Sequence, residues 1–348
     1  MRIAIVNDVA MAVEAMTRVL AQAPEHQLAW IARDGAEAIA QCARDTPDLI
    51  LMDIVMPGTD GVKATREIMA HSPCAILLVT ATIEARAGKV FEALGAGALD
   101  AVKTPILGAD GATGGAAALL AKIATLRRLI EPDMHRVGKP APPAAPERLP
   151  ASLRDSNLLV IGSSAGGPAA LATLLGGLPK DFPAAIVIVQ HVDEQFTPLM
   201  ANWLNDQSVI PVRVAREGAH PEPGTALIAG TNDHLVFLNP HTLAYTAEPR
   251  AYSYRPSVDV FFHSVVKHWK GNVAGVLLTG MGRDGAKGLK ALRDAGVLTI
   301  AQDRATSVVY GMPKAAAELG AACEILPLEK IAPRLSRHFS PIKTTPHE

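Results

Sequence analysis

The sequence has few cysteines, few aromatic residues and almost no net charge. Its three cysteines, Cys42, Cys74 and Cys323, are far apart and lack metal-binding spacing, so they predict small buried side chains in a reduced compartment. The formal net charge of −1 argues against nucleic acid or an anionic membrane as a partner. No apolar run approaches the ~20 residues of a membrane-spanning helix, and the run after Met1 is too short for a signal peptide. We therefore expect a cytoplasmic protein with no membrane insertion.

A length of 348 residues is enough for two domains, and the first repeats one pattern five times. Residues 1–130 alternate short apolar runs with helical stretches, of which the last lies near Ala116–Leu129. Five strand–helix units predict a parallel α/β sheet whose ligands gather at the carboxyl ends of its strands. The expected strands are Arg2–Val6, Leu28–Ala32, Leu49–Met52, Ala75–Val79 and Leu99–Val102.

Polar residues follow four of these strands. Asp8 follows the first, Asp53 the third, Thr80 the fourth and Lys103 the fifth. Carboxylates suit Mg²⁺, while a hydroxyl and an ammonium suit phosphoryl oxygens. Each residue alone is more commonly a helix cap or a solvated charge, but their joint placement favours a phosphoryl site.

These residues give the first domain a resemblance to the receiver domains of two-component response regulators. The resemblance rests on Val6-Asn7-Asp8, the run Asp53 to Gly61, Thr80-Ala81 and the stretch Gly97 to Pro105. It implies a flavodoxin-like (βα)5 fold in which a chemotaxis-type histidine kinase phosphorylates Asp53. It also implies Mg²⁺ held by Asp8, Asp53 and the carbonyl of Val55, with Thr80 and Lys103 supporting the phosphate.

The first domain departs from that family pattern at three places. Asn7 replaces one carboxylate of the usual acidic pair, which predicts weaker Mg²⁺ binding. The usual Lys-Pro is Lys103-Thr104-Pro105, which makes Lys103 a less secure phosphate partner. Ala101 replaces an aromatic switch residue, so we expect a modest response to phosphorylation.

A second domain follows a stretch without apolar periodicity. Prolines interrupt residues 131–155, which predicts an extended linker; a proline-rich ligand is the alternative. Residues 156–339 again alternate strands and helices, predicting a doubly wound, mainly parallel α/β domain, and residues 340–348 predict a disordered tail. The expected strands are Leu158–Ile161, Ala185–Gln190, Thr225–Ala229, His234–Leu238, Thr242–Thr246, Val273–Thr279, Val297–Ala301 and Glu324–Leu326, with helices at Ala315–Leu319 and Leu328–Phe339.

The first strand of this domain breaks into a turn of small residues around Ser164. Gly162-x-Ser164-x-Gly166 has the form of a nucleophile elbow, in which glycines allow a sharp turn and the serine stands beside a helix start. A glycine-rich turn that cradles a phosphate is the alternative interpretation. No full dinucleotide-binding fingerprint is present.

A base and an orienting carboxylate are available at the same expected sheet edge. His191 follows the strand Ala185–Gln190, and Asp284 follows Val273–Thr279, so both could converge with Ser164 as a catalytic triad. Taken singly, His191 could cap a strand end and Asp284 could cap the helix from Ala286. Asp259 is a rival carboxylate, although its place at a helix start suits capping. Backbone N–H groups at Ala165 and in Gly280-Met281-Gly282 are candidate oxyanion donors.

These separated motifs, with Arg255 to Asp259 and Tyr310 to Pro313, resemble the chemotaxis protein-glutamate methylesterases. The resemblance covers nearly the whole chain and implies Ser164 as nucleophile, His191 as base, Asp284 as orienter and Met281 as oxyanion donor. It implies hydrolysis of glutamate methyl esters on methyl-accepting chemoreceptors without a cofactor for the esterase, and deamidation of receptor glutamines. Ala165 stands where these enzymes often carry threonine. The opening Val6-Asn7-Asp8 resembles the surface-signalling (Wsp-like) branch.

Two other functions remain open from the sequence. In one, the second domain is a non-catalytic, phosphorylation-dependent signalling module that only binds a partner. In the other, the loop Gly162–Gly167 binds a phosphate ligand. Turnover of a methylated receptor separates the first from an esterase, and ligand titration tests the second.

Overall fold

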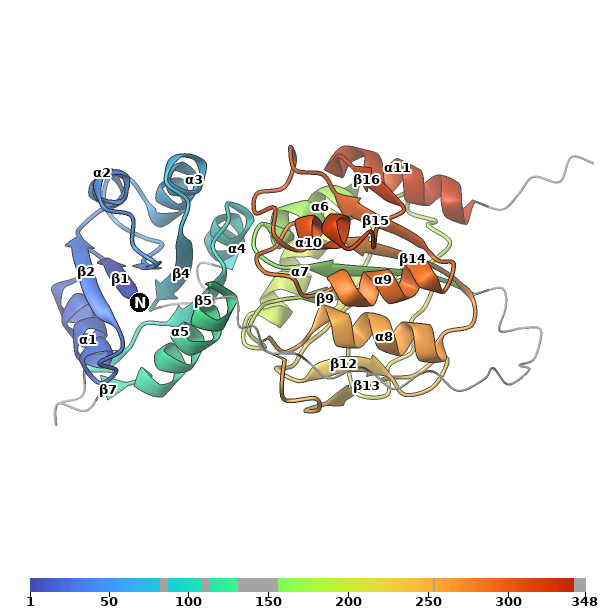
Figure 1. Cartoon of the computed structure of the whole chain (residues 1–348), viewed down its shortest axis with the longest axis horizontal. Helices are drawn as coiled ribbons and strands as arrows, with labels where there is room; N and C mark the ends of the chain where they lie inside the picture. Colours follow the sequence, from blue (N-terminus) through green and yellow to red (C-terminus); the bar gives the residue numbers. More distant parts are fainter. Residues whose placement is uncertain (82–86, 108–112, 131–155, 253, 341–348) are drawn as a thin grey trace, which may run out of the picture.

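The computed structural model describes residues 1–81, 87–107, 113–130, 156–252 and 254–340. It has two parallel sheets, each covered by helices on both faces (Figure 1). The linker expected at 131–155 and, apart from Ser340, the tail expected at 340–348 lie outside the described residues. Within the described residues, no helix is both long enough and apolar enough to cross a lipid bilayer.

The sheet of the first domain has the strand order β2-β1-β3-β4-β5, and every neighbouring pair is parallel. Alternate residues of β1 face opposite sides: Ile3 and Ile5 pack with α1 and α5, while Ala4 and Val6 pack with α2, α3 and α4. The strands are β1 (Arg2–Val6), β2 (Gln27–Ala32), β3 (Leu49–Met52), β4 (Ala75–Thr80) and β5 (Asp100–Lys103). The helices are α1 (Ala10–Ala21), α2 (Gly35–Arg44), α3 (Gly61–His71), α4 (Ala87–Gly95) and α5 (Ala116–Ile130).

The second domain contains a seven-stranded sheet of order β10-β11-β9-β8-β14-β15-β16, parallel throughout. Helices α6, α7 and α11 cover one face, and α8, α9 and α10 cover the other. The strands are β8 (Asn157–Ser163), β9 (Ala185–Gln190), β10 (Val212–Val214), β11 (Ala226–Ile228), β14 (Asn272–Leu277), β15 (Leu298–Gln302) and β16 (Glu324–Leu326). The helices are α6 (Gly167–Gly176), α7 (Thr197–Gln207), α8 (Val258–His268), α9 (Ala286–Asp294), α10 (Met312–Glu318) and α11 (Leu328–Phe339).

Small antiparallel pairs supplement both sheets. β12 (His234–Phe237) and β13 (Leu243–Thr246) form the hairpin that the turn around Asn239 predicts, and the Asn239 side chain accepts the N–H groups of His241 and Thr242. β6 (Ile106–Leu107) pairs with β7 (Thr113–Gly114). Neither this pair nor the edge strand β10 was predicted from the sequence. These elements are only two or three residues long, too short for a periodic pattern.

Several predicted boundaries differ from the observed ones by a few residues, and two of these differences have a clear local reason. The strand expected to reach Thr279 ends at Leu277. The Thr279 N–H donates to the side chain of Gln302 and not to a backbone carbonyl of a neighbouring strand. The helix expected at Ala315 begins at Met312, with Pro313 in its first turn where a missing N–H costs nothing.

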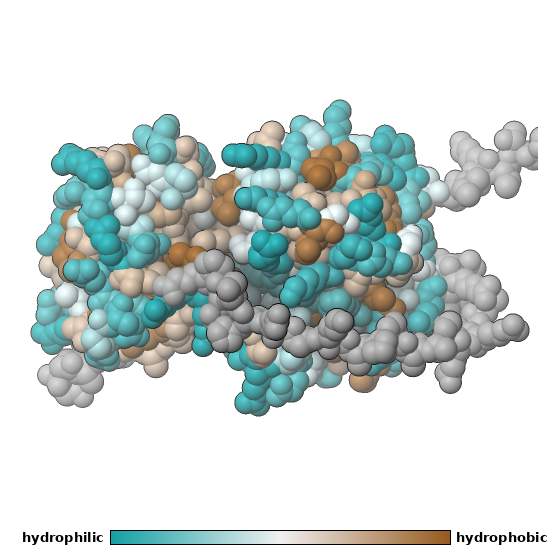
Figure 2. Space-filling view, in the orientation of Figure 1, coloured by the Kyte–Doolittle hydropathy of each residue, from teal (hydrophilic) through white to brown (hydrophobic). Residues whose placement is uncertain are grey.

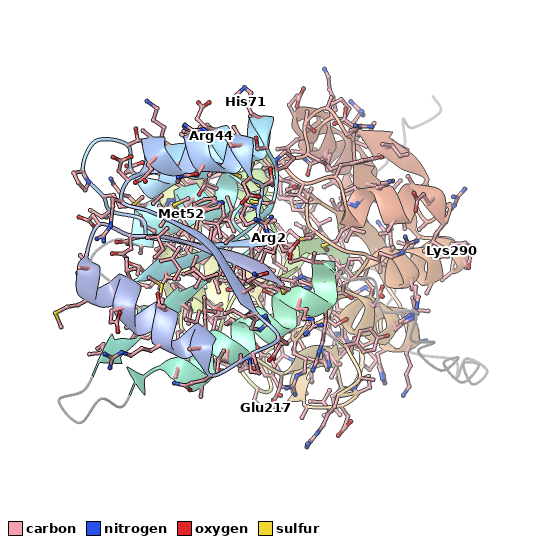
Figure 3. All side chains as sticks on the ribbon, turned by 60° about the vertical axis from the view of Figure 1, so that its left-hand side comes forward. Arg2, Arg44, Met52, His71, Glu217 and Lys290 are labelled. Carbon is pink, nitrogen blue, oxygen red and sulfur yellow. The ribbon has the colours of Figure 1, made fainter. Side chains whose placement is uncertain are left out.

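Charged side chains cover the surface and apolar ones fill the interior. Arg44 and His71 point outward from the ends of α2 and α3, whereas Met52 lies inside the first domain (Figure 3). The face shown in Figure 2 is mostly hydrophilic, and its brown patches are scattered.

The two domains touch through α4. This helix packs against α6 and α7, and the Phe91 and Trp203 rings lie 5.8 Å apart across the boundary (Figure 1). The Gly166 N–H donates to the Leu94 carbonyl over 2.8 Å. A side chain on Gly95 would meet Ala169 at 2.9 Å, so the close approach needs glycine. The apolar core is therefore continuous from one domain into the other.

Candidate active site

Ser164 lies in a tight turn between β8 and α6. The turn closes because Gly166 has a left-handed backbone, with φ of +79°, and the Ser164 N–H donates to the Thr279 carbonyl over 3.1 Å. A Cβ atom on Gly280 would lie 2.8 Å from the Ser164 Cβ, so glycine is required beside the serine. Only 4% of Ser164 is exposed with the first domain in place.

Gln190 holds this turn against the end of β9. Its amide nitrogen donates to the carbonyls of Ser164 and His191, both over 3.0 Å, and its amide oxygen accepts the Ser163 hydroxyl over 2.6 Å. The sequence predicts Gln190 only as the last residue of a strand, without a role of its own. A buried glutamine directly before a histidine at a strand end was the available signal.

His191 and Asp284 are hydrogen bonded, with 2.8 Å between Nε2 and the carboxylate. The same carboxylate accepts the Ser257 hydroxyl over 2.8 Å and the N–H groups of Val258 and Asp259 over 2.7 and 3.1 Å, at the start of α8. Burial opposes ionisation of Asp284, but the bonds from His191, Ser257 and the helix amide outweigh it and hold its pKa below the usual value. Asp284 is thus an anion aimed at the imidazole.

The bond between His191 and Ser164 is not made in this arrangement. The other ring nitrogen, Nδ1, is buried and has no hydrogen-bond partner among the described residues. The structure therefore places the predicted base and its predicted orienting carboxylate next to the serine turn, with no hydrogen bond between the predicted base and the predicted nucleophile.

Tyr254, which was not predicted from the sequence, stacks on His191. The rings of Tyr254 and His191 are stacked, with centroids 4.1 Å apart and an interplanar angle of 17°. The Tyr254 hydroxyl donates to Asp100 of the first domain over 2.9 Å. Its place beside the motif that begins at Arg255 was the only sequence signal.

The expected oxyanion turn lies at the domain boundary. The Gly280 N–H donates to the Val309 carbonyl over 3.0 Å, so it is already occupied. Half-buried Met281 packs against the apolar cluster of the first domain that contains Leu126. The roles of the Met281 and Ala165 amides stay predictions.

The carboxyl ends of β1, β3 and β4 bring the expected phosphoryl-site residues to one edge. Asn7 is buried and its side-chain nitrogen donates to Asp53 over 3.1 Å, while Asp8 is exposed. The Ile54 N–H donates to the other Asp53 oxygen over 2.7 Å. The Thr80 hydroxyl is fully buried, and no partner for it occurs among the described residues.

The donor set at this edge suits a hard cation that keeps part of its water shell. No group of three or more acidic, histidine or cysteine side chains positioned for a metal occurs in the described ranges. Asp8, Asp53 and the Val55 carbonyl offer oxygen only, and Mg²⁺ is commonly bound through one or two carboxylates. The residues therefore fit Mg²⁺, with one carboxylate fewer than an aspartate at position 7 would give.

Lys103 is the remaining residue of the expected phosphoryl site. It is exposed at the end of β5, where it pairs in register with Thr80 of β4. It also lines a cavity of about 480 Å³ between the domains, together with Arg128, Arg250 and Tyr254. No hydrogen bond or ion pair joins its side chain to another described residue. Its contact with a phosphoryl group stays a prediction.

Known proteins share both halves of this architecture. Residues 159–335 match the CheB methylesterase family, and residues 3–110 match the response regulator receiver domain. A protein-glutamate methylesterase/protein-glutamine glutaminase of Pseudomonas fluorescens is 58% identical over 98% of this chain and 100% of its own length. The chain belongs to the CheB methylesterase family.

A Pseudomonas aeruginosa relative of the same name is 57% identical over 97% of the chain and all of its own length. The crystal structure of the Thermotoga maritima CheB methylesterase catalytic domain is 37% identical, with a TM-score of 0.50, and covers 53% of this chain and 98% of that one. In this CheB methylesterase the match to the receiver ends at residue 110, before α5. Helix α5 nevertheless carries Lys122 and Leu126 to the domain boundary.

Proposed function

We propose that this protein hydrolyses glutamate methyl esters on methyl-accepting chemoreceptors and releases methanol, under control of phosphorylation at Asp53 by a chemotaxis-type histidine kinase. Deamidation of receptor glutamines is the second reaction proposed, in keeping with the names of the relatives. The observation that carries the proposal is the His191–Asp284 pair beside the Ser164 turn.

We propose a separate task for each ring nitrogen of His191. Nε2 is held by Asp284, so Nδ1 is the atom that takes the proton of Ser164. The Ser164 oxygen attacks the ester carbonyl, and the protonated imidazole returns the proton to the leaving methoxide. Water then attacks the acyl-enzyme with His191 again as base, which regenerates the serine and releases the glutamate.

Charge that develops in the reaction needs fixed partners. We propose the N–H groups of Ala165 and Met281 as donors to the tetrahedral oxyanion, because they flank the serine in its turn and in the adjoining glycine turn. The Asp284 carboxylate stabilises the imidazolium without taking its proton, as its lowered pKa favours.

In the receiver, Asp8, Asp53 and the Val55 carbonyl would hold Mg²⁺. When bound, the ion neutralises phosphoryl charge during transfer to Asp53. Thr80 supplies a buried hydroxyl for the phosphoryl oxygens, and Lys103 is proposed as a further support.

The docked receiver blocks the esterase. Ser164 is almost fully buried, and the Leu94 carbonyl of the receiver occupies the Gly166 N–H of the serine turn. Phosphorylation activates only by stabilising the open arrangement more than the closed one.

Methanol release from membranes that carry a methylated chemoreceptor tests the proposal. Ser164→Ala should abolish release, by several orders of magnitude, while thermal unfolding stays unchanged because the turn accepts a small side chain. Ser336→Ala on α11 is the matched control and should behave as wild type. Wild-type turnover by Ser164→Ala, or binding of the receptor without any turnover by wild type, would instead indicate a signalling module.

A further inference from the structure

Tyr254 contacts the proposed base without belonging to the triad. Its ring lies flat on His191, and its side chain is buried, with 6% of the residue exposed. A ring stacked at 4.1 Å fixes the plane of the imidazole, because tilting the imidazole would drive it into the tyrosine. The orientation of His191 thus depends on where Tyr254 is held.

The receiver determines where Tyr254 is held. The tyrosine hydroxyl donates to Asp100, at the first position of β5, over 2.9 Å, and Asp100 is 1% exposed. The same carboxylate pairs with Lys122 of α5 over 2.7 Å, and Lys122 also pairs with Asp193 over 2.9 Å. Asp193 is two residues after His191. The receiver therefore contacts both Tyr254, which stacks on the His191 ring, and the loop that follows His191.

The charges of this group favour a persistent contact. Burial, followed by the nearby Asp100 carboxylate, raises the pKa of Tyr254 well above that of a free tyrosine, so the phenol stays a neutral donor. Lys122 is paired on both sides, and the attraction of Asp100 and Asp193 outweighs its burial and raises its pKa. Neither Tyr254 nor Lys122 therefore loses its proton near neutral pH.

His191 is held in an incomplete arrangement while this contact exists. Its Nδ1 atom is buried and has no partner in the described part of the chain, although Ser164 lies in the adjoining turn. A buried ring nitrogen without a partner is unfavourable, so an imidazole free to turn would bond the serine. Something must oppose that movement: Asp284 holds Nε2, at one edge of the ring, and the stacked Tyr254 covers its face.

We infer that Tyr254 is the positioning residue of His191, and that Asp100 of the docked receiver uses it to hold the base away from Ser164. The inference rests on the proposed function. When the bond between Tyr254 and Asp100 is lost, His191 can turn to bond Ser164, and the departing receiver also exposes the triad. Because Asp100 begins the strand that ends beside Thr80, a shift of β4 and β5 reaches His191 through this tyrosine.

The test compares three variants of the full chain. Tyr254→Phe keeps the ring and removes its bond to Asp100, so unphosphorylated methanol release should rise about tenfold, as for loss of one hydrogen bond to a charged group. Tyr254→Leu also removes the stack, so its kcat should fall below that of Tyr254→Phe with little change in KM. Tyr252→Phe is the matched control, since Tyr252 lines the same cavity and contacts His234 instead of His191.

Labelling by a small fluorophosphonate provides a readout that needs no receptor. The probe reacts with a serine activated by its base, so Ser164 should be labelled about tenfold faster in Tyr254→Phe than in wild type or Tyr252→Phe. Thermal unfolding of each variant identifies a folding defect, and Asp100→Ala repeats the test from the receiver side.

The outcomes separate this inference from the proposed function. If wild type releases methanol and Tyr254→Phe equals it in both assays, the positioning role is wrong and the esterase stands. Equal losses in Tyr254→Phe and Tyr254→Leu would also overturn it, because they indicate simple structural damage. If no chain releases methanol and Ser164→Ala is labelled like wild type, the proposed function fails and this inference fails with it.

Discussion

Asp259 and Asp284 each accept hydrogen bonds from the first turn of the other's helix. Asp284, which lies just before α9, accepts the N–H groups of Val258 and Asp259 at the start of α8. Asp259, on α8, accepts the N–H of Gly288 at the start of α9 over 2.7 Å. Two helices are thereby joined around the carboxylate that we propose as the orienter of His191.

Asp259→Asn should make stability less dependent on pH. Burial, followed by the Asp284 charge, raises the pKa of Asp259 from 3.8 to about 7. Between these values the unfolded chain has released a proton that the folded protein keeps, so stability falls as pH rises and levels off above the folded pKa. The slope reaches about 1.4 kcal/mol per pH unit for one such group.

Asparagine keeps an oxygen for Gly288 and removes the titration. Thermal unfolding midpoints measured across this pH window should therefore drop less in the variant than in wild type. Asp284 does not mask the effect, because its folded pKa lies below the ordinary value of 3.8, and its contribution to stability is lost only as pH falls from that value through the folded pKa. Parallel curves would contradict the raised pKa of Asp259.

Asp284→Asn should lower kcat for methanol release about 10³- to 10⁴-fold, since the imidazole loses its anionic partner. Asparagine cannot accept every bond that the carboxylate takes from Ser257, Val258 and Asp259, so the variant should also lose about 1–3 kcal/mol of stability. Steady-state kinetics and urea unfolding measure the two effects. An activity loss no greater than that of Asp259→Asn would remove Asp284 from the triad.

Asn7→Asp should reduce the Mg²⁺ concentration needed for phosphorylation. Asn7 now donates a hydrogen bond to Asp53, whereas an aspartate there would add a third carboxylate beside Asp8 and Asp53. Labelling by a small phosphodonor over a Mg²⁺ series gives the half-saturating concentration, which should fall several-fold. Asp8→Asn should raise it and Asp53→Asn should abolish labelling. An unchanged requirement would mean that the missing carboxylate is irrelevant.

Removal of residues 1–150 should raise basal esterase activity at least as much as phosphorylation does. Interfaces between domains bury about 600–1,500 Å² and are reversible, but a nearly complete opening would need about 5.5 kcal/mol of differential stabilisation. Ala101 offers no aromatic switch, so we expect a partial shift on phosphorylation. Initial rates of the isolated second domain and of the full chain, with and without phosphodonor, decide this. A folded isolated domain slower than the unphosphorylated chain would contradict blocking by the receiver.

The sequence predicted those parts of the fold that a regular pattern specifies. The apolar runs of β1 and β9 gave strands with the observed bounds, and the parallel α/β class was confirmed. Both reactive edges followed from strand ends alone, which is why Ser164, His191 and Asp284 could be proposed together. Short edge strands such as β10 carry too few residues for a period to show.

Contacts between distant segments were beyond the sequence. Asp259 was interpreted as a cap of its own helix, but Ser257 is the N-cap of α8 and Asp259 accepts from α9. Asp284 had been considered as a cap of α9, and it accepts from α8 instead. The Tyr254–Asp100 bond joins residues 154 positions apart, and no local propensity encodes such a pair.

The bond from the Gly166 N–H to the Leu94 carbonyl uses backbone atoms only. Its donor and acceptor exist whatever side chains the two positions carry, provided that glycine keeps the turn and the close helix approach. Substitutions at neighbouring positions therefore leave this hydrogen bond between the domains intact. A receiver domain from a diverged relative should still be able to form it with this esterase domain. The side-chain contacts around it are then free to vary, and with them how tightly each receiver restrains its esterase.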